Sequence, residues 1–205
     1  MVQNTKPQRG RPRAYDPEIA LTRAMDKFWS TGYAATSLDD LSDAMRMNRP
    51  SIYAAFGDKE ALYRRAFDHY RASSRAAIGD ALDGKRPLRR ALRDFYERAI
   101  EIYLSGENSA RGCFMIGTTL TEAAENPQLR GTVAESLEGL DRILAARIAL
   151  GQQRGEVRSG ANPAELAQIA SAMLYLLAIQ ARAGETRKSL KSTMQAALNT
   201  ICAPE

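Results

Sequence analysis

Residues 49–54 carry side chains whose types suit the reading of DNA bases. The guanidinium of Arg49 can donate two hydrogen bonds to the O6 and N7 atoms of a guanine. Pro50 and Ala54 can offer apolar contact to the methyl group of a thymine. Ser51 and Tyr53 lie outside the apolar pattern of this segment, so they are free to point outward with Arg49. Base reading of this kind requires a short, exposed helix that presents its first turn to the major groove.

Two short helices around a tight turn are expected to position these side chains. Ser37 is a candidate N-cap with Asp40 as its return partner, and Asn48 is a second N-cap followed by Pro50 in the first turn. Apolar residues recur at helical spacing in both segments, namely Leu38, Leu41 and Met45, then Ile52, Ala55 and Phe56. This pattern indicates a helix-turn-helix, whose second helix enters the DNA major groove with its N-terminal residues first.

The stretch resembles the DNA-binding domain of the tetracycline-repressor (TetR) family over about residues 15–65. The resemblance depends on an ordered set of short motifs: Thr36-Ser37, two helices, Pro50-Ser51-Ile52-Tyr53, Phe56 and Asp58-Lys59-Glu60-Ala61-Leu62. It implies phosphate contacts by four residues, which are Thr36, Ser37, Tyr53 and Lys59. We place Asn48 and Ser51 in the same candidate DNA-binding surface. The family usually has glycine in the turn where this chain has Arg46, and a left-handed conformation there would cost about 1 kcal/mol.

The resemblance also implies a homodimer that binds a palindromic operator in double-stranded DNA and releases it when a small molecule enters a second domain. A two-fold dimer follows from physical reasoning as well. One short recognition helix contacts few base pairs, whereas two half-sites about one helical turn apart multiply the specificity. Two alternatives stay open at this point: an architectural DNA-binding protein without a ligand, and a helical interaction module whose helix-turn-helix is degenerate.

Composition predicts an all-α fold. Of the 205 residues, 44% are hydrophobic and 26% are charged, which is typical of a globular chain long enough for one or two domains. Strand-like alternation is absent, and Ala, Leu, Arg and Glu dominate. We predict a basic arm over residues 1–14, a helix-turn-helix DNA-binding domain over 15–60, and a ligand-binding and dimerisation domain over 61–205. A helix over about 59–82 links the two domains.

The basic arm accounts for most of the net charge of +5. Four basic residues precede the first acidic one, and the sequence Gly10-Arg11-Pro12-Arg13 is similar to the core of an AT-hook. Extended Arg11 and Arg13 side chains can enter a narrow A·T minor groove, where the negative potential is strongest. The arm is expected to be a solvated tail in the free protein and to become ordered on DNA.

Several other classes of protein are disfavoured. The longest apolar run, residues 172–179, is far shorter than the ~20 residues that span a bilayer, and no signal peptide is visible, so we expect a cytoplasmic protein without membrane contact. Cys113 and Cys202 are too few for a disulfide framework or a metal site. The single histidine, His69, has no catalytic partner pattern, so we predict no enzyme activity, catalytic residue, metal or cofactor.

The second domain is expected to hold helices over about 88–104, 112–125, 129–152, 163–183 and 187–202. Aromatic walls with a few polar groups are typical of a small-molecule site. The candidate ligand-binding residues are Tyr70, Phe95, Tyr96, Tyr103, Phe114, Met115, Thr118, Thr119 and Glu122. The alternative is that this set is simply core. If a ligand binds, we expect a neutral or weakly cationic aromatic compound anchored by Glu122.

The last two helices are predicted to form the dimer interface. Helix 163–183 is apolar nearly all round, which indicates burial on more than one side. The candidate interface residues are Leu166, Ile169, Met173, Leu177, Leu190, Met194, Leu198 and Ile201.

Overall fold

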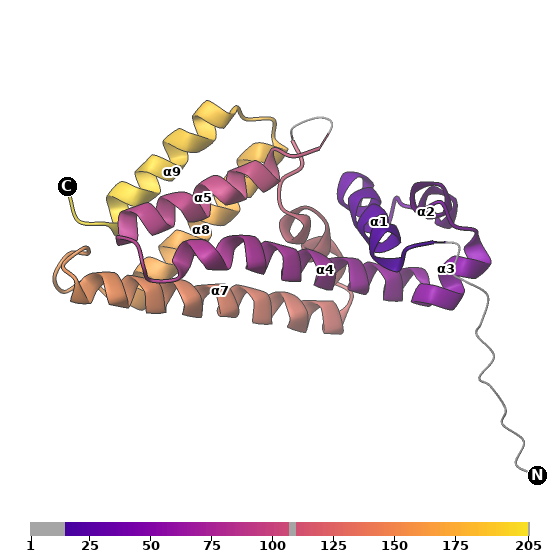
Figure 1. Cartoon of the computed structure of the whole chain (residues 1–205), viewed down its shortest axis with the longest axis horizontal. Coiled ribbons are helices and arrows are strands. Elements are labelled where there is room, and N and C mark those ends of the chain that lie inside the picture. The colour runs from indigo at the N-terminus through magenta and orange to yellow at the C-terminus, as the bar shows by residue number, and fades with distance from the viewer. Residues whose placement is uncertain (1–14, 107–109, 205) are drawn as a thin grey trace, which may run out of the picture.

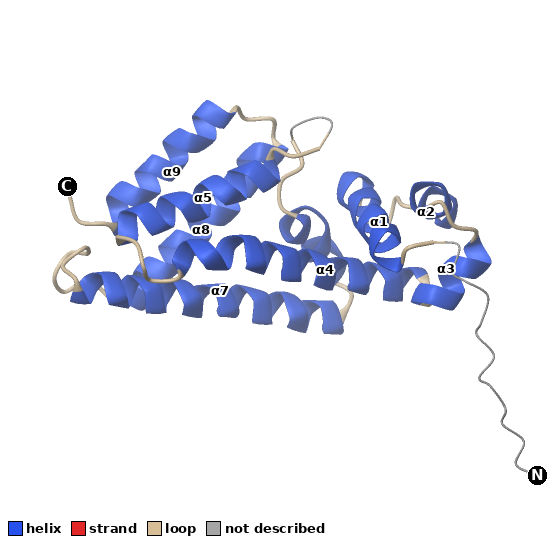
Figure 2. Ribbon diagram, viewed as in Figure 1, coloured by secondary structure: helices blue, strands red, loops and turns tan. Residues whose placement is uncertain are grey.

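The computed structural model describes residues 15–106 and 110–204, so the predictions for the basic arm, Arg11 and Arg13 included, fall outside the described part. The prediction of an all-α fold is confirmed: Figure 2 shows helices and connecting loops throughout these residues, without a strand. The α-helices are α1 (Pro17–Thr31), α2 (Leu38–Met45), α3 (Arg49–Phe56), α4 (Lys59–Gly79), α5 (Leu88–Tyr103), α6 (Leu120–Ala123), α7 (Pro127–Gln153), α8 (Pro163–Arg182) and α9 (Arg187–Ile201).

Side-chain N-caps, two of them predicted above at Ser37 and Asn48, define the starts of α1, α2 and α3. The Asp16 side chain accepts hydrogen bonds from the first turn of α1, and Ser37 and Asp40 form a complete capping box on α2. Asn48 caps α3 by accepting from the Ser51 backbone N–H at 2.9 Å. Phe28 and Trp29 are buried in the small core of these helices. Local sequence signals therefore set the elements that present the recognition helix.

The turn between α2 and α3 keeps its left-handed residue although that residue is not glycine. Arg46 has φ 55° and ψ 44°, and its exposed side chain points away from the core. The backbone N–H of Met47 donates to the Ser42 carbonyl at 3.1 Å, and that of Arg46 to the Asp43 carbonyl at 3.3 Å. These two bonds form a Schellman motif. The Ser42 hydroxyl also donates to the Met47 carbonyl. The cost of the left-handed residue is offset by these bonds.

Helix α4 joins the two ends of the elongated molecule (Figure 1). It begins directly after α3, packs along α1, and ends in the 3-10 turn Asp80–Leu82, which matches the helix predicted over about 59–82. His69 lies on α4 with Nε2 3.4 Å from the Thr22 hydroxyl and Nδ1 3.8 Å from a Glu18 carboxylate oxygen. The histidine therefore braces α1 against α4.

Helices α5, α7, α8 and α9 pack together at the other end of the molecule (Figure 1). Helix α8 is long and apolar enough to cross a membrane by length and composition. It packs against α5, α7 and α9, and this burial on several sides explains part of its apolar character.

The prediction of one helix over 112–125 is wrong. A π-helix over Met115–Thr119 leads into the four-residue helix α6, and Gly112 lies before both in a left-handed conformation with φ 65°. The Asn126 side chain accepts hydrogen bonds from the backbone N–H groups of Gln128 and Leu129. Pro127 is therefore the first residue of α7, because asparagine followed by proline suits a helix start as well as a helix end.

Candidate DNA-binding surface and ligand cavity

Helix α3 presents a continuous exposed face. Arg49, Pro50, Tyr53 and Ala54 are exposed, whereas the apolar stripe of the helix packs inward. Tyr53 keeps 49% of its surface accessible, an unusual exposure for an aromatic residue of this size. Ser51 is half-buried beside this face. The structure thus brings together the predicted base-reading residues on one side of a short helix.

Ser37 and Asn48 are exposed, but their side-chain oxygens act as helix caps. The Ser37 hydroxyl lies 2.6 Å from an Asp40 carboxylate oxygen, and its backbone N–H donates to the same oxygen at 2.9 Å. Hydrogen bonds from Ser37, followed by Lys27, hold the pKa of Asp40 well below its usual range. These caps hold the N-termini of α2 and α3 in a fixed geometry.

Thr36 does not fit its predicted role as a phosphate contact. Its side chain is fully buried, and its hydroxyl donates to the Gly32 carbonyl at 2.5 Å while lying 2.6 Å from the Thr31 hydroxyl. The threonine ties the end of α1 to the start of α2. The sequence pattern alone did not reveal that the end of α1 covers this side chain.

Arg49 has a partner that the sequence reasoning missed. Its guanidinium pairs with Asp39 in the first turn of α2, with Nε 2.8 Å from the carboxylate oxygen Oδ1. Both side chains are exposed to solvent. Ten residues separate the two, so helical periodicity within one element carries no signal for the pair.

Lys59 lies at the start of α4 with its ammonium group over the Tyr33 ring, 4.4 Å from the ring centroid. This cation–π contact positions the charge near the start of the helix while leaving the residue half-exposed. The tyrosine itself packs against Phe28 and Tyr63 of the core. Lys59 is therefore held at the base of α4 in a position compatible with a phosphate contact.

A cavity of about 140 Å³ lies between α4, α5, α7 and α8, next to the π-helix. Tyr70, Tyr103 and Met115 line it, as the sequence predicted. The remaining lining residues are Phe67, Arg71, Ser74, Arg75, Ile78, Gly79, Leu82, Cys113, Ser136, Gly139, Leu140, Ile143, Leu174 and Tyr175. The lining residues on α4 recur at helical spacing from Tyr70, so the sequence pattern could have identified them.

Six predicted ligand-binding residues lie away from this cavity. Phe95 and Tyr96 are fully buried, with the Tyr96 hydroxyl donating to the Ala170 carbonyl at 2.9 Å. Phe114 is buried among the rings of Tyr63, Phe67 and Tyr70. For these three, the alternative of core packing holds.

Thr118 and Thr119 are satisfied by the protein itself. The Tyr63 hydroxyl lies 2.9 Å from the Thr118 hydroxyl and 3.1 Å from that of Thr119, and Thr118 donates to the Phe114 carbonyl at 2.8 Å. Burial raises the pKa of Tyr63. Glu122 is half-buried away from the cavity, and desolvation raises the pKa of its carboxyl. The expected polar anchor is therefore absent from the cavity wall.

Cys113 forms part of the cavity wall together with Tyr70. The tyrosine hydroxyl lies 3.0 Å from the Cys113 sulfur, and burial raises the pKa of the thiol. The Tyr70 ring packs edge-on against Trp29 of α1, with 4.9 Å between the ring centroids. The cavity wall thus touches the core of the helix-turn-helix end directly.

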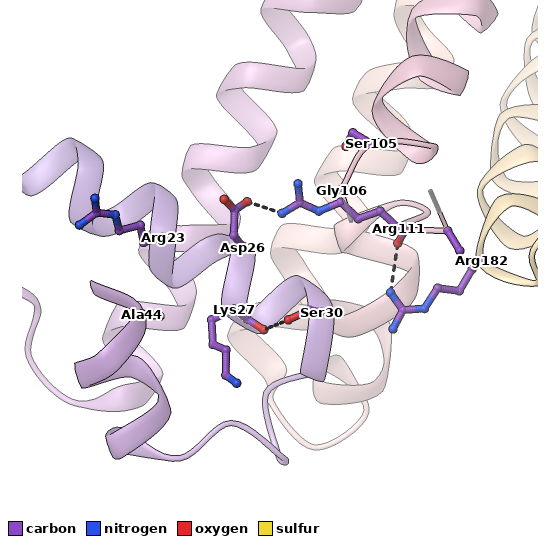
Figure 3. Close-up of a pocket in the computed structure, with 10 residues that line it drawn as sticks. Arg23, Asp26, Lys27, Ser30, Ala44, Ser105, Gly106, Arg111 and Arg182 are labelled. Carbon is purple, nitrogen blue, oxygen red and sulfur yellow. Dashed lines mark hydrogen bonds and ion pairs between the residues drawn. The ribbon is translucent and has the colours of Figure 1, made fainter. Parts of the chain in front are cut away.

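The segment before Cys113 makes a second connection to α1. The Trp29 indole N–H donates to the Arg111 carbonyl at 3.1 Å, and the Arg111 guanidinium lies 3.8 Å from the Trp29 ring centroid. Figure 3 shows Arg111 directed toward Asp26, with which it forms an ion pair, and Arg182 directed toward the Arg111 carbonyl at 3.1 Å. These groups border a larger, open and charged hollow of about 620 Å³.

Gly112 is required by this junction. A Cβ atom at Gly112 would lie 2.9 Å from the Ala178 carbonyl oxygen, and its positive φ disfavours other residues. Residues 111–113 therefore contact α1, α8 and the cavity together.

The predicted dimer residues fall into two groups. Leu177, Leu190, Met194, Leu198 and Ile201 are buried in the core of their own chain, so the prediction does not hold for them. The apolar face of α9 packs onto α5 and α8, and its outer face is polar. Leu166 and Met173 are half-buried, and Ile169 is 39% exposed.

Helix α8 instead exposes an apolar stripe that the prediction named only at Ile169. Leu176 is 39% exposed and Ile179 is 54% exposed, with the exposed Ala172 between them and Ile169. We call Ile169, Ala172, Leu176 and Ile179 the α8 stripe. Their spacing of three and four residues places them on one side of the helix. A row of exposed apolar side chains on one side of a helix is a candidate interaction surface.

Comparisons with known proteins agree with this geometry. Residues 20–66 match the model of bacterial regulatory proteins of the tetR family, and residues 87–197 match the tetracyclin repressor-like C-terminal domain. The HTH-type transcriptional repressor ComR of Escherichia coli (strain K12) is 32% identical over 202 residues, covering 98% of this chain and 94% of ComR. A cysteine mutant of the TetR family regulator CifR, solved with 26-bp double-strand operator DNA, is 32% identical with a TM-score of 0.83, covering 94% of this chain and all of that one.

Proposed function

This chain belongs to the tetracycline-repressor family and is a DNA-binding transcriptional repressor, and we propose that it acts as a homodimer released from a palindromic operator by a small molecule. One observation carries the proposal. Helix α4 follows the recognition helix directly, and its second half forms a wall of the apolar cavity. Occupancy of the cavity can therefore act on the helix that positions α3.

The contacts around the cavity support a defined route for the switch. Tyr70 touches the cavity, the Cys113 thiol and the Trp29 ring. A ligand that displaces Tyr70 or the segment 111–113 acts on α1 and α4 together. Release of DNA requires that the ligand bind the displaced state more tightly than the DNA-bound state, because equal affinity for both shifts nothing.

The α8 stripe is the surface that we propose for dimerisation. Pairing two copies through it would bury Leu176 and Ile179 and would place two recognition helices in one particle. A fixed distance between them is what a palindromic operator requires. The same helix also touches the junction at residues 111–113, since Arg182 donates to the Trp29 and Arg111 carbonyls.

The proposal is tested in two steps. Sequencing of genomic fragments retained by the protein, measured against random DNA, gives the operator; retention without sequence preference would instead indicate an architectural protein. Compounds are then screened for release of this operator. Compounds that act on the wild type should fail on Ser74→Trp, which fills the cavity from α4, while that variant keeps its operator affinity.

Ser73→Trp is the matched control, because Ser73 is the neighbouring, exposed residue of α4 and does not line the cavity. It should respond to the compounds as the wild type does. If the compounds released Ser74→Trp from the operator as readily as they release Ser73→Trp, the ligand site would lie elsewhere.

A further inference from the structure

We infer that the cavity beside α4 takes a small aromatic carboxylate, with the carboxylate group paired to Arg71 and the ring between the aromatic walls. The inference rests on the proposed function, because it names the ligand class of the same cavity. It also reverses the ligand charge expected from the sequence, which was neutral or weakly cationic, because the proposed anchor Glu122 lies outside the cavity wall.

The charges at the cavity favour an anion. Arg71 and Arg75 line it four residues apart on α4, and the lining residues that the structure describes include neither aspartate nor glutamate. Ser74 and Ser136 also line it, but the Ser136 hydroxyl donates to the Thr132 carbonyl at 2.6 Å and is not available to a ligand. A cationic ligand would meet like charge here, whereas a carboxylate meets two guanidinium groups.

Arg71 carries the specific observation. Its Nε atom is buried and has no hydrogen-bond partner among the described residues, while Nη1 lies 3.3 Å from a carboxylate oxygen of Asp68. The guanidinium also packs over the Phe67 ring at 5.8 Å. Asp68 thus pairs with Nη1 of the Arg71 guanidinium and leaves the buried Nε–H without an acceptor. Buried donors are normally paired, and a carboxylate in the cavity would supply the missing acceptor.

The volume and the lining of the cavity suit a ligand with a single aromatic ring. Its volume of about 140 Å³ is close to the ~150 Å³ cavity that accommodates benzene. Phe67, Tyr103 and Tyr175 provide aromatic surface, and Leu140 and Leu174 provide aliphatic surface. A benzoate-sized molecule therefore satisfies both the apolar interior and the arginine at its edge.

The single tryptophan of the chain allows a direct binding measurement, because Trp29 contacts Tyr70 at the cavity wall. Benzoate and its neutral isostere benzamide are titrated separately into the full-length protein, with Trp29 fluorescence and calorimetry as readouts. We expect benzoate to bind at least about tenfold more tightly than benzamide, because the carboxylate accepts a charged hydrogen bond from a buried donor. Equal binding of the two compounds would overturn the inference.

Three variants test where the carboxylate group of the ligand binds. Arg71→Gln should lower benzoate affinity about tenfold and leave benzamide affinity unchanged, and Arg71→Lys should retain part of the preference because it keeps the charge. Arg158→Gln, an exposed arginine outside the cavity, removes the same charge and should change neither affinity. Unchanged benzoate binding by Arg71→Gln would contradict the inference.

The outcomes separate this inference from the proposed function. Selective benzoate binding that never releases the operator supports the ligand class and contradicts the switch. Operator release by a neutral compound, blocked by Ser74→Trp and without benzoate binding, supports the switch and contradicts the ligand class.

Discussion

Arg49 Nε donates a hydrogen bond to Asp39 Oδ1 at 2.8 Å, and Nη2 of the same guanidinium donates to the same oxygen. This side-on pairing leaves the outer edge of the guanidinium, formed by Nη1 and Nη2, available for a guanine. The pair is exposed, so it orients Arg49 without holding it strongly. We therefore expect Asp39 to act as a positioning residue for base reading by Arg49.

Asp39→Asn should weaken discrimination at the guanine that Arg49 reads while raising affinity for unrelated DNA. The substitution removes both the orienting acceptor and a negative charge near the phosphates. Binding to operators that differ at one base pair, measured at fixed salt, checks this. An Asp39→Asn protein with unchanged discrimination would show that Arg49 is oriented by DNA alone.

Arg49→Ala and Lys59→Ala should affect DNA binding in different ways. The first should weaken operator binding about 5- to 150-fold and relax the preference at one base pair of each half-site. The second should weaken binding to all sequences alike, because a lysine that contacts phosphate carries no sequence information. If both variants changed general affinity only, the assignment of Arg49 to base reading would be wrong.

Deletion of residues 1–13 should flatten the salt dependence of DNA binding. Each phosphate contact that is lost removes about 0.9 from the slope of log affinity against log salt. Affinity for sites with A·T-rich flanks should fall more than affinity for G·C-rich flanks. An unchanged slope would mean that the arm stays free on DNA.

Ile179→Glu and Leu176→Glu should yield folded monomers with much weaker operator binding, because the charge falls on the exposed α8 stripe. Sedimentation gives the mass, and circular dichroism confirms the helical content. Gln195→Glu, on the exposed polar face of α9, serves as the control and should remain dimeric. Leu198→Glu should instead unfold the chain, since Leu198 is fully buried. Intact dimers of Ile179→Glu would refute the placement.

Tyr63→Phe should destabilise the protein by about 1–3 kcal/mol, because two buried threonine hydroxyls lose a hydrogen-bond partner. Urea unfolding of the variant and the wild type measures the difference. A variant as stable as the wild type would show that water replaces the tyrosine hydroxyl. Tyr53→Phe, which removes an exposed hydroxyl from α3, should leave stability nearly unchanged.

The sequence by itself determined the helix boundaries around the recognition helix. Ser37, Asn48 and Asp58 cap the helices that follow them, and the apolar stripes of α2 and α3 face inward as their spacing predicts. Caps and stripes involve residues three or four apart, so their geometry is set locally. For the same reason the exposure of Arg49, Pro50 and Ala54 could be read from the pattern.

Only the tertiary structure decided which polar groups meet and which apolar faces stay open. Tyr63 reaches Thr118 and Thr119 across more than fifty residues, which removes the need for a ligand that their composition suggested. The stripe of α9 is as regular as that of α8, yet α5 and α8 cover the first, whereas Ile179 keeps 54% of its surface exposed. Periodicity gives the face that a helix buries, but the helix that covers it depends on long-range packing, and that contact decides whether a residue belongs to a core, a cavity or an interface.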